Sequence, residues 1–276
     1  MMAQDTDFIE QAYDYHLETR YGEVGYDGVT TLSSLANWLQ EAAGHSADSL
    51  GFGEKAMSAH GVTWILTRLV LRIQRLPLPG ERLKVHTWPS VLDRFGHRGY
   101  EVFDENGQLL IRGGSAWGVM DLHTRRMTAL PSDLTAHYPA HPRPCDPFTC
   151  RTLPRLNGNE GATSAIRVRR DDLDINAHVN NARYLSWLLE ALPLRPAGSD
   201  PLVPRLVDIT FRMECFPGDE LISLARLVEP DDTADPAPFR LVHALRAIRG
   251  QEGECREEEV CRAISLWAEN PLYCAS

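Results

Sequence analysis

Three polar side chains of different chemistry stand at alternate positions just ahead of a predicted helix. Asp174, Asn176 and His178 lie in the run DDLDINAHVNNARYLSWLLE, and in an extended lead-in this spacing projects them to one side. The amide and the imidazole could hold a carbonyl or a water between them, while the carboxylate could fix the tautomer of the imidazole. Free backbone amides at a helix start can also stabilise an oxyanion, so the pattern suits acyl transfer.

The same stretch also suits helix capping, because Asp and Asn side chains accept hydrogen bonds from the free amides of a first turn. Asn180 and Asn181 stand directly at the start of the predicted helix. Capping alone requires neither the histidine nor so many amides at alternating spacing. We therefore expect a site here, with Asn180 and Asn181 among the substrate contacts.

A second pair of candidates lies further along the chain, at the end of a predicted strand. Glu214 and Cys215 directly precede the turn at Pro217 and Gly218. Taken alone, Glu214 is typical of a solvated strand end and Cys215 of a small buried hydrophobic residue. Their types also fit a general base and a nucleophile.

The elements that would position these residues occur twice. Residues 131–160 contain six prolines, which resist helix and central strand, and are interpreted as a linker between units 1–130 and 161–276. Each unit has one amphipathic helix followed by long strands joined by tight turns, which predicts an α+β fold with antiparallel sheets. The expected helices are 31–48 and 179–192, and the expected strands are 62–75, 81–88, 98–104, 108–120, 203–214, 219–228, 239–248 and 259–268.

Two local alignments indicate a duplication. The helix segments NWLQEA, from Asn37, and SWLLEA, from Ser186, align with an offset of 149 residues, whereas the turns at Pro79 and Pro217 align with an offset of 138. The first half therefore carries about eleven extra residues near GFGEKAMSAHG.

The first half lacks the polar residues of the second at the matching positions. Gly25 stands opposite Asp174, Asp27 opposite Asn176 and Val29 opposite His178. We expect the first unit to be non-catalytic and to supply much of an apolar pocket, with Leu35, Leu39 and Ala43 on one helix face.

The run DLDINAHVNNARYLSWLLE resembles the DxNxHVNNxxYxxW signature of the acyl-ACP thioesterases, plant plastid and bacterial enzymes of fatty acid biosynthesis. Further stretches resemble the family in its order, from YGEVGYDGVTTLSSLANWLQEAA to ITFRMECFPGD, and together they cover most of the chain. The resemblance implies two tandem hot-dog units, each a curved antiparallel sheet around one long helix, and a thioester hydrolase that releases fatty acid from acyl carrier protein. It assigns catalytic positions to Asp174, Asn176, His178, Glu214 and Cys215.

Two mechanisms fit these residues. In one, Cys215 is a nucleophile activated by His178 and forms an acyl-enzyme. In the other, Glu214 deprotonates a water that attacks the thioester, while Asn176, His178 and helix amides hold the carbonyl. We favour the water mechanism, because hot-dog thioesterases generally use a carboxylate and a helix terminus.

Substrate contacts away from the chemistry are expected in the first unit. Met57, Trp64 and Trp117 are candidates for the floor of the acyl pocket, although each is also typical of an ordinary core residue. An acidic carrier protein requires a local positive surface, for which the candidates are Arg68, Arg72, Arg75, Arg125 and Arg126, with Arg94, His97 and Arg98 as further sources.

Composition narrows the remaining classes of function. A formal charge of -10 disfavours a nucleic-acid-binding protein, and six cysteines without a CxxC pair indicate neither a metal site nor a disulfide framework. We expect no cofactor, no membrane span, a cytoplasmic location of bacterial type, and a monomer or homodimer. The alternatives are an acyl-CoA thioesterase, a hydratase of the same fold, or a non-enzymatic protein that binds acyl thioesters.

Overall fold

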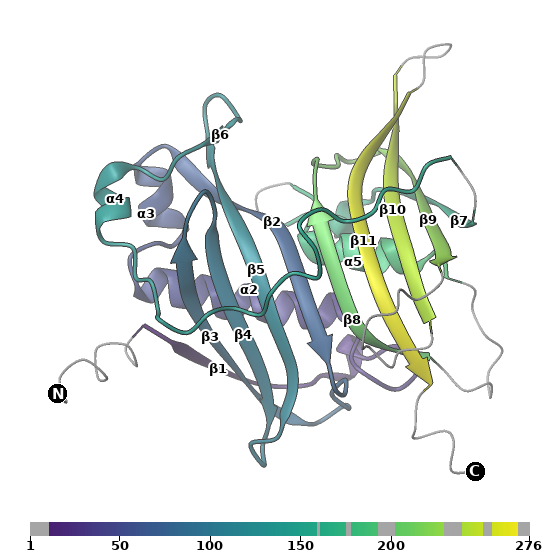
Figure 1. Ribbon diagram of the computed structural model, residues 1–276, viewed down its shortest axis with the longest axis horizontal. Coiled ribbons are helices and arrows are strands. Elements are labelled where there is room, and N and C mark those ends of the chain that lie inside the picture. Colours follow the sequence, from purple (N-terminus) through teal and green to yellow (C-terminus); the bar gives the residue numbers. More distant parts are fainter. Residues whose placement is uncertain are drawn as a thin grey trace. The chain divides into compact units, whose positions relative to one another are not determined.

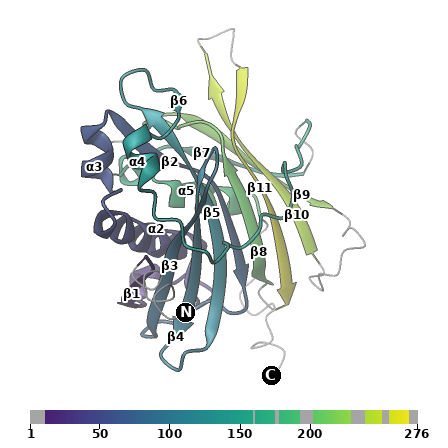
Figure 2. The same cartoon turned by 60° about the vertical axis from the view of Figure 1, so that its left-hand side comes forward.

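The chain forms two compact units, Met1–Phe148 and Thr149–Ser276. The computed structural model describes residues 11–158, 161–174, 178–192, 202–228, 239–250 and 256–269. Within each unit, the described strands form an antiparallel sheet and one helix packs against it (Figures 1 and 2). This α+β architecture is the tandem hot-dog arrangement expected from the sequence.

The first unit orders its main strands β1-β3-β4-β5-β2, with β6 paired to β5. Helix α2 packs against β1 and β3, and the short helix α3 packs against β2. The elements of this unit are β1 (Tyr13–Glu18), α2 (Leu32–Ser49), α3 (Glu54–Ala59), β2 (Val62–Ile73), β3 (Arg82–Leu92), β4 (Gly96–Asp104), β5 (Leu109–Asp121), β6 (Met127–Thr128) and α4 (Ser132–Ala136).

The second unit repeats this order as β7-β9-β10-β11-β8. Helix α5 packs against β9 and β10, on the sheet drawn in green and yellow in Figure 1. The elements of this unit are β7 (Ala162–Arg167), α5 (Asn181–Leu189), β8 (Leu202–Phe211), β9 (Glu220–Val228), β10 (Phe239–Arg249) and β11 (Arg256–Glu269).

Helix α2 shows why this segment folds as a helix against a sheet. Thr31 caps its start, since its hydroxyl accepts a hydrogen bond from the amide of Ser34 at 3.1 Å. The predicted apolar face is confirmed, because Leu35, Leu39 and Ala43 are 0%, 2% and 6% exposed. Burying side chains of this size contributes roughly 1.5 to 3 kcal/mol for each leucine.

The duplication extends to individual hydrogen bonds. The amide of Thr31 donates to the carbonyl of Glu23 at 3.0 Å, and 149 residues later the amide of Asn180 donates to that of Asp172 at 2.9 Å. The turns match as well, because Gly80 and Gly218 both adopt positive φ, at 80° and 89°. The internal alignment predicted from the sequence is therefore confirmed by the backbone.

The extra residues of the first unit form an element of their own. The segment expected to be an insertion, GFGEKAMSAHG, contains helix α3. Its Met57 is fully buried and packs with Val62 and Val119. The inserted helix thus extends the core at one end of the first sheet.

The proline-rich segment is packed against the units rather than loose. It contains the five-residue helix α4, which shows that a helix does form between Pro131 and Pro139. The indole of Trp88 donates to the carbonyl of Arg143 at 2.9 Å, and further on Leu153 and Leu156 are buried in the core of the second unit. The division between the units falls within this segment.

The described part of the chain contains neither a membrane-spanning helix nor a group of side chains that could bind a metal ion. None of its helices has the length and apolar character needed to cross a membrane. Among the same residues, no group of His, Cys, Asp or Glu side chains is arranged to hold a metal ion.

Candidate functional site

The lead-in to helix α5 forms a small closed loop. The amide of Asp174 donates to the carbonyl of His178 at 2.7 Å, and the amide of His178 donates to Oδ1 of Asp174 at 3.2 Å. A bridge between Leu173 and Val179 closes the loop on its outer side. Asp174 therefore contacts the backbone of His178, while Asn176 lies outside the described residues.

Asn180 is the N-cap of α5. Its side-chain oxygen accepts a hydrogen bond from the amide of Ala182 at 2.9 Å, which is the capping role weighed against substrate contact in the sequence. Asn181 is the first residue of the helix and is partly exposed. Asn180 therefore caps the helix two residues after His178, and its contact with substrate stays a prediction.

The structure brings His178 and Glu214 together. Nδ1 of His178 lies 4.0 Å from Oε1 of Glu214, and the two side chains are 36% and 39% exposed. This separation is longer than a direct hydrogen bond. A carboxylate and an imidazole at this distance, both open to solvent, can share a water or a carbonyl oxygen between them.

Cys215 is adjacent in sequence but is buried away from solvent. Its side chain is 1% exposed, and burial raises the pKa of the thiol to about 11. A hydrogen bond with the Tyr184 side chain and the guanidinium of Arg249 oppose this rise, whereas Asp219 adds to it. The thiol is therefore protonated near neutral pH, which is the opposite of an activated nucleophile.

The first unit has the same loop without the chemistry. The amide of Gly25 donates to the carbonyl of Val29 at 2.9 Å, as Asp174 does to His178. The carboxylate of Asp27 is half-buried in this loop, and burial raises its pKa. Val29 cannot act as an acid or a base, so this loop cannot repeat the arrangement of the second unit.

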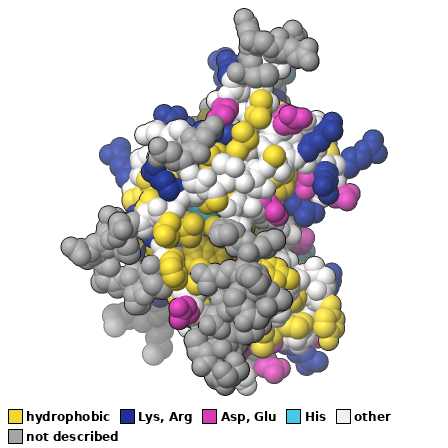
Figure 3. Space-filling view, turned by 90° about the vertical axis from the view of Figure 1, so that its right-hand side faces the viewer, with side chains coloured by type: hydrophobic (Ala, Val, Ile, Leu, Met, Phe, Trp, Pro, Cys, Tyr) yellow, Lys and Arg dark blue, Asp and Glu magenta, His cyan; other side chains and the backbone are white. Residues whose placement is uncertain are grey.

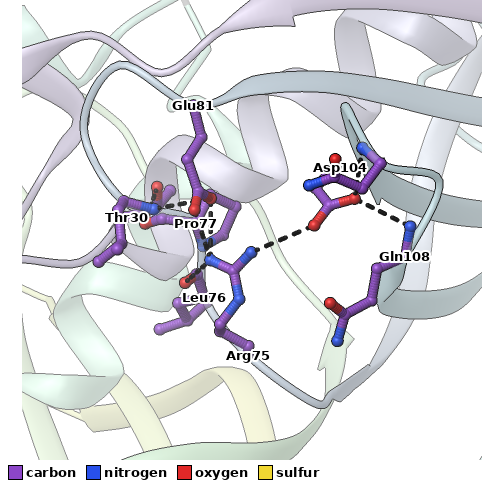
Figure 4. Close-up of polar contacts among 9 residues, drawn as sticks. Thr30, Arg75, Leu76, Pro77, Glu81, Asp104 and Gln108 are labelled. Atoms are coloured by element: carbon purple, nitrogen blue, oxygen red, sulfur yellow. Dashed lines mark hydrogen bonds and ion pairs between the residues drawn. The ribbon is translucent and has the colours of Figure 1, made fainter. Parts of the chain in front are cut away.

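The turn that corresponds to Glu214 and Cys215 in the first unit carries Leu76 and Pro77 (Figure 4). Thr30 bonds the carbonyl of Pro77 through its amide and its hydroxyl, both at 2.9 Å. Arg75 bonds both carboxylate oxygens of Glu81 at 2.8 Å. This turn is locked by structural contacts and presents no carboxylate in the place of Glu214.

The candidates for the acyl pocket lie at one end of the first unit. Met57 is fully buried and Trp64 packs against its cluster, whereas Trp117 is partly buried and its indole donates to the hydroxyl of Ser115 at 2.7 Å. A cavity of about 390 Å³ adjoins this cluster, with Val119 and Leu130 common to both. Met57 and the partly buried Trp64 thus belong to a cluster that shares residues with the cavity lining, and their contact with an acyl chain stays a prediction.

The candidate carrier-binding arginines do not gather in one place. Arg68 lies over the ring of Phe148, at 4.5 Å from its centroid, and Arg72 pairs with Asp146 at 3.0 Å. Arg75 follows the C-terminal end of β2, whereas Arg125 and Arg126 follow the end of β5 that pairs with Val62 at the other end of β2. Twelve residues of β2 separate these ends, or about 40 Å at ~3.3 Å per residue.

The face shown in Figure 3 carries both signs of charge. Acidic and basic side chains are interspersed over it, and hydrophobic side chains gather between them. This face is therefore not a purely cationic surface.

The profile of the acyl-ACP thioesterase N-terminal domain matches residues 10–138, and that of the acyl-ACP thioesterase C-terminal domain matches residues 157–269. Together these profiles span most of both units. The chain belongs to the acyl-ACP thioesterase family.

Plant members of the acyl-ACP thioesterase family are similar in sequence over most of this chain. The chain is 28% identical over 244 residues to the chloroplastic acyl-[acyl-carrier-protein] hydrolase FATB1 of Cuphea viscosissima, covering 83% of this chain and 57% of that protein. It is 26% identical over 286 residues to the chloroplastic oleoyl-acyl carrier protein thioesterase 1 of Arabidopsis thaliana, covering 94% and 77%.

A solved structure gives the same result. The 12:0-ACP thioesterase from Umbellularia californica superposes with a TM-score of 0.79 at 26% identity, covering 94% of this chain and 95% of that one. The chain thus spans nearly all of this solved structure but under two thirds of the Cuphea protein's full length. The double hot-dog fold implied by the sequence is confirmed.

Two residues near Glu214 were missed by the sequence reasoning. Tyr184 of α5 accepts a hydrogen bond from the amide of Cys215 at 3.0 Å, and Arg249 at the end of β10 donates to the carbonyl of Glu214 at 2.6 Å. Tyr184 is the tyrosine of the family signature, which was the available signal. Arg249 offers no such signal, because its contact spans 35 residues.

Proposed function

We propose that this chain hydrolyses the thioester of fatty acyl carrier protein and releases a free fatty acid. The observation that carries the proposal is the approach of His178 to Glu214 at 4.0 Å, beside the start of α5 in the second unit. Membership of the acyl-ACP thioesterase family supports the same reaction. The first unit, with Val29 and Leu76 at the matching positions, is proposed to be non-catalytic.

In the proposed mechanism, the carboxylate of Glu214 takes a proton from a water whose oxygen attacks the thioester carbon. The carbon–sulfur bond then breaks, and the leaving sulfur of the carrier takes up the proton that Glu214 removed from the water, which restores the carboxylate. His178, Asn176 and the first turn of α5 hold the carbonyl oxygen as negative charge develops. The raised pKa of the Cys215 thiol supports a packing role for this residue instead of a nucleophilic one.

The substrate contacts are proposed for the first unit. The cavity of about 390 Å³ beside Val119 and Leu130 is a candidate for part of the acyl-binding region, where each buried methylene contributes roughly 0.8 kcal/mol. The adjacent Arg125 and Arg126 are both exposed, just beyond the end of β5, and are proposed to meet the acidic carrier protein. The cytoplasmic location and the oligomeric state stay predictions.

A thiol-release assay tests the proposal. Purified protein is offered acyl carrier proteins and acyl-CoAs of graded chain length, and Glu214→Gln is compared with Glu257→Gln. Glu257 is a matched control because it is also a glutamate of the second unit, paired with Arg246 at 2.9 Å.

We expect release from acyl carrier protein, a loss of roughly a hundredfold to ten-thousandfold in Glu214→Gln, and full activity in Glu257→Gln. Folded protein that releases no thiol from any acyl carrier protein would contradict the proposed reaction. Preference for acyl-CoA would redirect the assignment to the acyl-CoA thioesterase alternative.

A further inference from the structure

Both peptide groups that flank Glu214 are held by side chains from elsewhere in the second unit. The hydroxyl of Tyr184 accepts from the amide of Cys215 at 3.0 Å and donates to the carbonyl of Met213 at 3.4 Å. Arg249 donates to the carbonyl of Glu214 itself at 2.6 Å. The backbone that carries the Glu214 carboxylate is thus fixed on both sides of this residue.

The arginine contact is common to both units. In the first unit Arg75 donates to the carbonyl of Leu76 at 3.4 Å and pairs with Glu81. In the second unit Arg249 bonds the carbonyl of Glu214 and pairs with Asp219 at 3.1 Å. Since Leu76 has no catalytic group, an arginine at this turn stabilises the fold in either unit.

The tyrosine contact belongs to the second unit. By the offset of 149 residues Tyr184 corresponds to Leu35, and by the offset of 138 residues Cys215 corresponds to Pro77. Leucine has no hydroxyl and proline has no amide hydrogen, so donor and acceptor are both missing from the first unit. The bond is therefore present in the unit that carries Glu214 and absent from the unit that carries Leu76, although both units form the turn.

Packing fixes the position of the tyrosine hydroxyl. Tyr184 is 3% exposed, and its ring centroid lies 5.5 Å from that of Trp187 and 5.6 Å from that of Phe211. Cys215 is 1% exposed, so its amide has no access to bulk water as a substitute partner. Leaving such a buried amide unpaired is costly, which ties the segment to the helix.

We propose that Tyr184 is a positioning residue that holds the Glu214 carboxylate toward His178 by binding the main chain on both sides of it. The inference rests on the proposed function of Glu214 as general base. Because α5 also carries the His178 loop at its start, the bond fixes the general base Glu214 and the carbonyl-binding His178 to one helix. Misplacement of a catalytic group by about 1 Å can cost on the order of a hundredfold in rate.

The test combines kinetics with hydrogen exchange. Tyr184→Phe removes the hydroxyl and keeps the ring, and Ser223→Ala is the control, because the Ser223 hydroxyl is buried and bonds the carbonyl of Leu188 on α5 at 3.3 Å. Both are measured alone, and Tyr184→Phe is also measured in the Glu214→Gln background. Hydrogen exchange of the peptide covering residues 212–219 measures how firmly Tyr184 holds the main chain around Glu214, which we call the clamp, and it does so independently of activity.

For Tyr184→Phe we expect kcat to fall about tenfold to a hundredfold, KM to stay within about twofold, and exchange at residues 212–219 to accelerate. In the Glu214→Gln background the same change should have little further effect, since residues acting through one group are not additive. Ser223→Ala should retain the kcat and the exchange pattern of the native protein.

The possible outcomes separate the two proposals. Normal kcat in Tyr184→Phe, or an equal loss with and without the Glu214 carboxylate, would overturn the positioning role alone. Native kcat in Glu214→Gln would overturn the base proposed for the reaction. If the protein released no thiol at all, unchanged exchange at residues 212–219 in Tyr184→Phe would still refute the clamp.

Discussion

The choice between Cys215 and a water as nucleophile can be decided by pH. Burial raises the pKa of the Cys215 thiol to about 11. A group of that pKa is about 0.01% ionised at pH 7 and about 0.1% ionised at pH 8, since each pH unit changes the ratio tenfold. A reaction limited by this thiolate would therefore accelerate about tenfold for each unit between pH 7 and pH 10.

A water activated by Glu214 predicts a different profile. We expect kcat to change less than about threefold from pH 7.5 to pH 9.5, and Cys215→Ala to keep activity within about fivefold, because Cys215 acts as a packing residue. The assay is thiol release under saturating substrate in buffers of constant ionic strength, with circular dichroism to confirm folding. A slope near one in log kcat against pH, abolished in Cys215→Ala, would refute the reasoning.

Three further predictions concern stability and carrier binding. Burial lowers the pKa of His243 to about 4 in the folded protein, below its value in the unfolded chain. The neutral imidazole therefore contributes to the free energy of unfolding above pH 6.5, and this contribution is lost as pH falls toward 4. Urea unfolding should show that the free energy of unfolding decreases by about 3 kcal/mol over this pH range in the native protein, and that this decrease is absent in His243→Leu. Leu39→Ala should cost about 2 to 5 kcal/mol by the same measurement, whereas the exposed Glu41→Ala should cost under about 0.5 kcal/mol. Arg125→Glu with Arg126→Glu should raise KM for acyl carrier protein and leave KM for a small acyl thioester unchanged; equal changes in both would contradict a carrier-binding role.

Much of the fold could be predicted because its signals are local. The alternating strands, the apolar face of α2 and the Pro-Gly turns each depend on residues close in sequence, and β2 (Val62–Ile73) and β9 (Glu220–Val228) lie close to their predicted ranges. Helix α3 was missed because the six residues from Glu54 to Ala59 lie in an insertion with no counterpart in the other half. Its burial depends on contacts with β2 that the sequence does not display.

The sequence indicated candidate residues for the chemistry of the site, but not the side chains that hold the backbone around Glu214. The approach of His178 to Glu214 joins residues 36 positions apart by number, and the family resemblance indicated both, His178 through the signature and Glu214 through the stretch ITFRMECFPGD. The clamp of Tyr184 on the chain around Glu214 depends on how the end of β8 meets α5. A periodic pattern describes one element at a time, so such contacts between elements escape it.

The residue types at positions 35 and 77 bear on whether the first unit, which we propose to be non-catalytic, could be made catalytic by substitution. Grafting a histidine at Val29 and a glutamate at Leu76 would restore the reacting groups but not the bond that Tyr184 makes to the amide of Cys215. Proline at position 77 removes the donor, and leucine at position 35 removes the acceptor. With both the donor and the acceptor missing, neither is left without a partner. Providing only one of them by substitution would leave that buried group unpaired. Both positions would therefore have to be changed together to provide this bond in the first unit.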